Sequence, residues 1–160
     1  MTVTIHELIE RKKPADLEKI ERTLAAQPAR SPEAEAALSA LIWRRRTDGR
    51  SGLLGAFMHK DCAERIAMLG DHLEEIGAHD AAAALRELRA EIPLSDDLIG
   101  RGLIDWVDSR PDIVREAREL DSRLEDVAPL IWDYLRDCGD AVPDLPLHQP
   151  RRGLLARWLS

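Results

Sequence analysis

A helical hairpin over residues 61–93 is the feature that most constrains the fold of this chain. Its first half carries apolar residues at alternating steps of four and three, which lie on one face of a helix: Cys62, Ile66, Leu69, Leu73 and Ile76. Its second half repeats this spacing with Ala81, Leu85, Leu88 and Ile92. Gly77 suits the left-handed end of the first helix, Asp80 can cap the second, and Pro93 closes it. Because the connection is so short, the two helices must be antiparallel.

The rest of the chain is also predicted to be helical. Aromatic residues make up only 4% of the sequence and β-branched runs are absent, which favours helix over strand. Further helices are expected at 5–11, 14–26, 32–46, 96–108 and 111–138, the last of them interrupted at Pro129. We therefore expect an all-α, single-domain bundle of about seven to nine helices around the central antiparallel hairpin. It covers residues 1–139, and residues 140–160 form a Pro-rich segment and a short C-terminal amphipathic helix.

Capping residues mark where several of these helices begin. Thr4 and Glu7 have the spacing of a capping box, Ser31 precedes a proline at the first helical position, and Ser95 can cap the helix at 96–108. The segment Gly52–Lys60 is apolar but contains two glycines, so the sequence allows either a short helix or a buried loop.

Composition argues against a membrane or exported protein. No stretch approaches the roughly 18 uninterrupted apolar residues of a membrane span, and the N-terminal residues lack the apolar block of a secretory signal. The chain has two cysteines, Cys62 and Cys138, which we expect to be reduced in a cytoplasmic protein.

Charge is distributed unevenly along the chain. The net charge is −7, but residues 61–139 hold 9 Arg and 20 Asp/Glu, a net of −11, whereas residues 1–60 hold 11 Lys/Arg and 8 Asp/Glu, a net of +3. Such an acidic body repels nucleic acid and attracts basic partners. The candidate partner-binding residues are nine acids off the apolar rows: Asp71, Glu74, Glu75, Glu87, Glu91, Asp105, Asp108, Glu116 and Glu119. The alternative interpretation of these acids is solubility alone.

Catalytic and metal motifs are not recognisable in this sequence. Zinc requires about four converging nitrogen or sulfur ligands, and the histidines and cysteines here lack paired spacing: His59, Cys62, His72 and His79. Adjacent acids such as Glu74 and Glu75 point away from one another on a helix and make poor catalytic pairs. The basic run Arg44–Arg46 can contact phosphate, but it more often stabilises a helix C-terminus. We expect no catalytic residues, no cofactor, no metal and no direct binding of nucleic acid.

Three segments together carry a family resemblance. GLLGAFMHKD is followed by LEEIGAHDAAAALRELRAEIP and then by ELDSRLEDVAPLIWDYL. With its alanine-rich helix ending in an Ile-Pro step, this arrangement resembles the C-terminal domain of the bacterial DNA-mimic protein family, over about residues 35–138. The resemblance implies an all-helical regulator or inhibitor that binds another protein and has no catalytic residues.

The leading hypothesis is therefore a cytoplasmic protein-binding module whose acidic face engages a basic partner, such as a DNA-binding regulator. One alternative is an immunity- or antitoxin-like protein that neutralises a toxin. Another is an enzyme or metal protein that uses the histidines and Cys62. In the tail, we expect Leu155 and Trp158 to dock onto the helical body, and an exposed row that includes Leu154, Leu155 and Trp158 would instead suit a homodimer contact.

Overall fold

The computed structural model describes residues 2–93 and 101–148, and this part of the chain is mainly helical. Its α-helices are α1 (Ile5–Arg11), α2 (Asp16–Ala25), α3 (Pro32–Thr47), α4 (Gly55–Met58), α5 (Lys60–Ala63), α6 (Ile66–Glu75), α7 (His79–Glu91), α8 (Arg101–Asp108), α9 (Pro111–Asp121) and α10 (Ala128–Cys138). Two short 3₁₀ helices are η1 (Gly52–Leu54) and η3 (Gly139–Ala141). Within the described residues there is no β-strand, so the predicted all-α class is confirmed.

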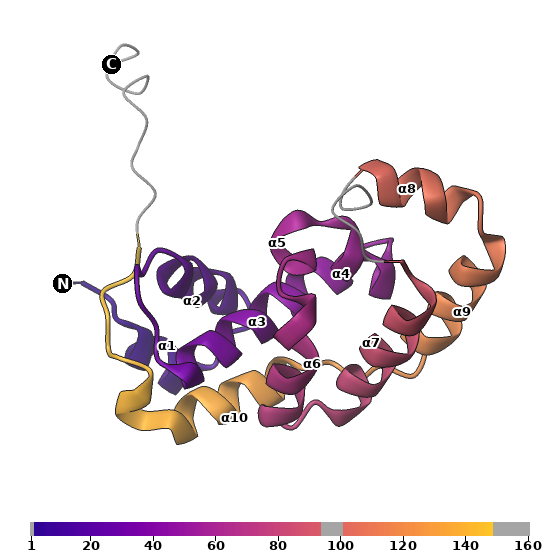
Figure 1. The fold of residues 1–160 in the computed structure, drawn as a ribbon. Coiled ribbons are helices and arrows are strands. Elements are labelled where there is room, and N and C mark those ends of the chain that lie inside the picture. The colour runs from indigo at the N-terminus through magenta and orange to yellow at the C-terminus, as the bar shows by residue number, and fades with distance from the viewer. Residues whose placement is uncertain (1, 94–100, 149–160) are drawn as a thin grey trace, which may run out of the picture.

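Helix α3 runs through the middle of the molecule (Figure 1) and contacts α2, α4, α5, α6 and α10. Every residue from 36 to 43 is buried. A helix with no solvent-exposed face along this stretch must be surrounded by other helices. The remaining helices are accordingly packed around α3, with α1, α2 and α10 toward one end and α4 to α9 toward the other (Figure 1).

The predicted hairpin is present as α6 and α7, and α6 packs against α3. Gly77 has a φ of +88°, as expected for the residue that ends α6. The N–H of Ala78 donates to the carbonyl of Leu73 at 2.8 Å, and the N–H of Gly77 donates to the carbonyl of Glu74 at 2.9 Å. These two bonds form a Schellman motif, which satisfies carbonyls at the end of α6 and turns the chain into α7.

Two details of the predicted hairpin are wrong. The helix from Cys62 is not continuous, because α5 ends at Ala63 and α6 begins at Ile66. At this break the side chain of Arg65 bonds to residues of α3. Asp80 does not cap α7: the capping position is Ala78, and Asp80 lies in the first turn, where its carboxylate interacts favourably with the helix dipole.

Other predicted helix ends agree with the structure. Thr4 and Glu7 form the capping box of α1, and the Oγ of Ser31 accepts a hydrogen bond from the Ala34 N–H at 3.1 Å. The segment 52–60 is helical and mostly buried, in η1, α4 and the start of α5. The expected interruption near Pro129 is wider than a kink, because α9 ends at Asp121 and α10 begins only at Ala128.

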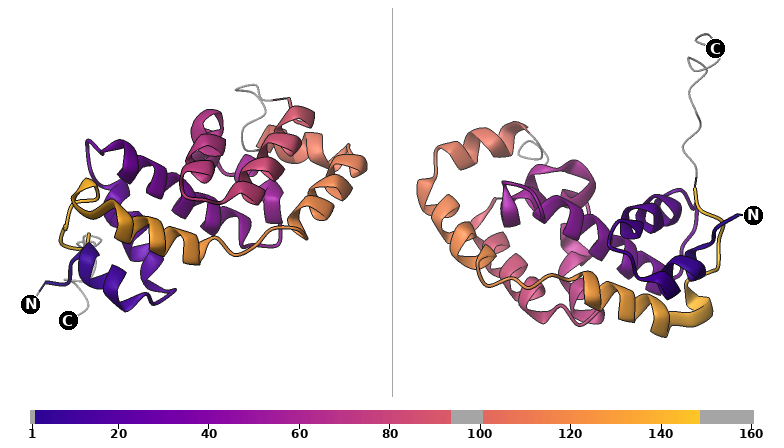
Figure 2. Two further views of the ribbon diagram at one scale, coloured as in Figure 1. Left: turned by 90° about the horizontal axis from the view of Figure 1, so that it is seen from below. Right: turned by 180° about the vertical axis from the view of Figure 1, so that it is seen from behind.

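The N-terminal segment lies beside residues 145–147 (Figure 2). The N–H of Ile5 donates to the carbonyl of Leu145 at 2.9 Å, and the N–H of Leu147 donates to the carbonyl of Val3 at 3.1 Å. An isolated bridge joins Thr4 to Pro146. These bonds hold the chain after η3 against α1. The predicted cap Ser95 and the predicted C-terminal helix with Leu154, Leu155 and Trp158 lie outside the described residues.

None of the helices in the described ranges is long and apolar enough to cross a membrane.

Candidate partner-binding surface

The nine predicted partner-binding acids lie on four helices, and all of them are exposed or half-buried: Asp71, Glu74 and Glu75 on α6, Glu87 and Glu91 on α7, Asp105 and Asp108 on α8, and Glu116 and Glu119 on α9. The structure divides them into groups with different surroundings. Which carboxylates are available to a partner therefore depends on what each already contacts.

Two acids of α6, Asp71 and Glu74, contact basic side chains of α7. Arg86 donates to Asp71 at 2.9 Å and to Glu74 at 3.0 Å. The Nδ1 atom of His79 also lies within hydrogen-bonding distance of Glu74. The contact with His79 and the smaller contribution of Arg86 lower the pKa of Glu74. These acids thus pair across the hairpin.

Glu75 points away from this cluster and contacts α10 instead. The hydroxyl of Tyr134 donates to its carboxylate at 2.5 Å. Burial, and then this hydrogen bond, raise the pKa of the Tyr134 hydroxyl. Glu75 therefore links the hairpin to α10, and a substitution there would affect this helix contact as well as the surface charge.

Four of the predicted acids form one group where α7 packs against α9, and we call this group the acidic ridge: Glu87, Glu91, Glu116 and Glu119. Within the described residues, none of the four has an ion-pair partner within 4.0 Å. Partial burial, followed by repulsion from Glu91, Glu87, Asp112 and Glu119, raises the pKa of Glu116. The other three acids of the ridge therefore lie close enough to Glu116 to repel its charge.

The acids of α8 belong to neither group. Asp105 and Asp108 are exposed on a helix that packs against α4 and α9. Next to the ridge, Asp112 is paired with Arg110 at 2.8 Å, and this hydrogen bond lowers the pKa of Asp112 to about 2. The structure therefore brings together four of the nine predicted residues.

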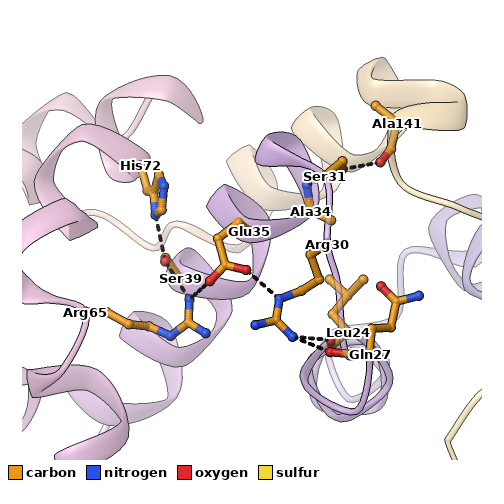
Figure 3. A network of polar contacts seen from close by, with 10 residues as sticks. All are labelled: Leu24, Gln27, Arg30, Ser31, Ala34, Glu35, Ser39, Arg65, His72 and Ala141. Atoms are coloured by element: carbon orange, nitrogen blue, oxygen red, sulfur yellow. Dashed lines mark hydrogen bonds and ion pairs between the residues drawn. The ribbon is translucent and has the colours of Figure 1, made fainter.

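A different arrangement of charges surrounds α3 (Figure 3). The carboxylate of Glu35 accepts hydrogen bonds from Arg30 and from Arg65, the latter at 2.6 Å. Arg65 also donates to the hydroxyl of Ser39 at 3.1 Å, and Nδ1 of His72 lies 2.7 Å from the same hydroxyl. Burial would raise the pKa of Glu35, but its hydrogen bonds to the two arginines outweigh that effect and lower it. This network joins α3 to α6.

The basic run at the end of α3 is also paired internally. Arg45 donates to Glu21 of α2 at 2.9 Å and to Asp61 of α5 at 2.9 Å. Arg46 donates to Asp61 at 2.9 Å. Burial opposes these bonds, yet together they lower the pKa of Asp61. Both guanidinium groups thus hold α2 and α5 against α3, which favours the helix-stabilising interpretation of this run over phosphate contact.

Two potential nucleophiles among the described residues, Ser39 and Cys62, are buried. The hydroxyl of Ser39 lies beside the ring of His72, but Ser39 is fully buried and its hydroxyl already has two partners. Cys62 is also fully buried, and burial raises the pKa of its thiol to about 12, so the reactive thiolate is scarce at neutral pH. Among residues 2–93 and 101–148, no group of three His, Cys, Asp or Glu side chains could hold a metal ion.

Comparison of this chain with models of known protein families, with curated proteins and with solved structures gives no match. The resemblance to the DNA-mimic family therefore stays a prediction. The functional interpretation of the ridge depends on its charge and geometry.

Proposed function

We propose that this protein is a protein-binding regulator or inhibitor whose acidic ridge engages the basic surface of a DNA-binding partner. The observation that carries the proposal is that the four ridge carboxylates gather where α7 packs against α9, with no ion-pair partner within 4.0 Å among the described residues. Partial burial, and then repulsion from the neighbouring acids, raises the pKa of Glu116. A cationic side chain placed among these carboxylates would relieve that repulsion. The acids paired with Arg86 gain less from such a cation, because their charge is already compensated.

The ridge is also held on a rigid support. Leu85 and Leu88 of α7 and Ile113 and Ala117 of α9 are buried in the common core. Side chains four residues apart, such as Glu87 and Glu91, are separated by about 6 Å along a helix axis. Carboxylates fixed in this way can occupy a groove that normally binds DNA phosphates, because phosphate contacts are mainly electrostatic. The resemblance to the DNA-mimic family adds to this argument.

We place this interaction in the cytoplasm. Cys62 and Cys138 are both free thiols in the structure, which suits a reducing compartment.

The test is capture of the partner from host lysate with the full chain and with two charge-reversal variants. The ridge variant carries Glu87→Lys, Glu91→Lys, Glu116→Lys and Glu119→Lys. The control variant carries four reversals at exposed acids elsewhere: Glu10→Lys, Glu18→Lys, Asp137→Lys and Asp140→Lys. Both variants change the net charge by the same amount, so a difference between them reports the position of the charges.

We expect the wild type and the control to retain a basic protein at low salt and to release it at high salt. The ridge variant should not retain this basic protein. Added duplex DNA should displace the basic protein from the wild type. Equal capture by both variants would rule out the ridge. Retention in the presence of excess DNA would argue against a DNA mimic, and a toxin captured in that way would support the neutraliser alternative.

A further inference from the structure

A cleft with a volume of about 240 Å³ lies where η1 and α4 face α8 and α9. Its apolar lining consists of Leu54, Met58, Val107, Val114 and Ala117. Along α9, Val114 and Arg118 turn toward the cleft, whereas Glu116 and Glu119 belong to the ridge. At 100° per residue these two pairs occupy opposite flanks of the helix. The cleft is therefore separate from the proposed partner-binding surface.

Three charged residues line the same cleft: Arg50, Arg118 and Asp121. Both arginines are exposed, and neither forms an ion pair within 4.0 Å among the residues that the structure describes. Guanidinium groups match the planar geometry of a carboxylate, to which they can donate two parallel hydrogen bonds. The lining therefore has a formal charge of +1 and an apolar floor.

Close backbone contacts fix the walls of this cleft. Gly52 has a φ of +52°, and a Cβ at this position would lie 2.8 Å from Oδ2 of Asp121. A Cβ at Gly55 would lie only 2.0 Å from the carbonyl oxygen of Arg46, so α4 is held directly against the end of α3. A side chain at Gly55 would force α4 away from the end of α3, and a residue other than glycine would be strained at the positive φ of Gly52. These contacts define the backbone wall of the cleft at η1 and α4.

We propose that this cleft binds a small monocarboxylate with an apolar body. The carboxylate would lie between Arg50 and Arg118, and the apolar body would contact Val107, Val114 and Met58. The carboxylate of Asp121 disfavours ligands with two negative charges, which includes phosphate esters at neutral pH. The volume is below the roughly 300–1,000 Å³ typical of sites for drug-sized ligands, so the ligand should be of about amino-acid size.

The test is an NMR titration of the ¹⁵N-labelled full chain with 4-methylpentanoate and, separately, with its uncharged amide. The two probes have the same shape, so the difference between them reports the carboxylate. We expect chemical-shift changes concentrated at residues 50–58 and 107–121, with a Kd on the order of 0.1–1 mM for the acid. The amide should bind roughly tenfold more weakly.

Three variants locate the binding. Arg118→Gln should weaken binding of the acid about tenfold, because it removes a charge-assisted hydrogen bond. Val114→Trp should abolish binding by filling the cleft. Arg123→Gln, which makes the same charge change at an exposed residue outside the cleft, should leave the affinity unchanged.

Three results would overturn the proposal: no localised shifts at about 10 mM acid, equal affinity for acid and amide, or an unchanged affinity in Arg118→Gln. Arg118→Gln alters an exposed side chain and should fold, so the test stays decisive even if Val114→Trp does not fold. The four-fold ridge variant should bind the acid as the wild type does, which separates this proposal from the proposed function.

Discussion

The carboxylates around α3 and those on the acidic ridge are the same chemical group in opposite situations. Glu35 lies between two arginines that lower its pKa, whereas partial burial and then the neighbouring acids raise the pKa of Glu116. The first arrangement stabilises the fold, because it joins helices that are distant in sequence. The second arrangement destabilises the fold slightly, because the carboxylates of the ridge repel one another. Acids of the second kind are the better candidates for binding, because a partner can supply the missing positive charge.

The largest expected effect comes from removing the charge between the two arginines. Glu35→Gln should lower the free energy of unfolding by about 2 kcal/mol, because Arg30 and Arg65 would lose their shared anion. Urea denaturation measures this change. Glu33→Gln, on the same first turn of α3, is the matched control and should change stability by less than about 0.5 kcal/mol. Equal losses of stability in both variants would show that the pairing of Glu35 with the two arginines does not stabilise the fold.

A smaller loss is expected when the buried hydroxyl of this network is removed. Ser39→Ala should lower the free energy of unfolding by about 1 kcal/mol, because Arg65 and His72 would each lose their hydrogen-bond partner at a fully buried hydroxyl. Ser122→Ala, at an exposed position after α9, provides the comparison. Thermal unfolding followed by circular dichroism is sufficient to rank the two. If the variants are equally stable, the hydroxyl is dispensable.

At low pH, the paired carboxylate of Glu35 should no longer contribute to the free energy of unfolding. The folded pKa of Glu35 lies below the ordinary glutamate value of 4.5, so its contribution to stability is present above that pH and is lost as the pH falls through the folded pKa. The difference in unfolding free energy between wild type and Glu35→Gln should therefore shrink below about pH 4.5. Urea titrations at a series of pH values measure it. A difference that stays constant down to the lowest pH would contradict the assigned pairing.

The smallest effect has the opposite sign. The folded pKa of Glu116 is raised above 4.5, so the charged form destabilises the fold once the pH exceeds that value. Glu116→Gln should increase the free energy of unfolding at neutral pH by a few tenths of a kcal/mol, and added salt should reduce the gain. Glu125→Gln, at an exposed acid in the loop after α9, is the control. A loss of stability in Glu116→Gln would contradict repulsion within the ridge.

Local signals in the sequence were sufficient to predict much of the fold. Thr4, Ser31 and Gly77 act within a few residues of their own position, and each has its predicted role at a helix end. Pro129 correctly signalled an interruption, although the break begins earlier than a proline effect alone would require. Asp80 was misjudged because α7 already begins at His79, which places Asp80 inside the first turn.

Contacts between distant segments could not be predicted in this way. Arg65 meets Glu35 across 30 residues, and nothing in the local pattern at 61–66 indicated that α5 and α6 would separate there. A signal for the central position of α3 was available, since an apolar, alanine-rich stretch without a polar face predicts a helix buried on all sides. The division of the nine acids into paired and unpaired groups depends on how α7 packs against α6 and α9, which spacing along the chain does not determine.

The bonds that hold residues 3–5 beside residues 145–147 have a practical consequence for assays. They place the N-terminal segment at the end of the molecule opposite α7 and α9 (Figures 1 and 2). A bead or sensor chip attached through an N-terminal tag would therefore present the ridge to solution. Attachment through surface lysines would mostly give the same orientation, because three of the four lysines, Lys12, Lys13 and Lys19, lie in or beside α1 and α2 and α6 to α10 contain none.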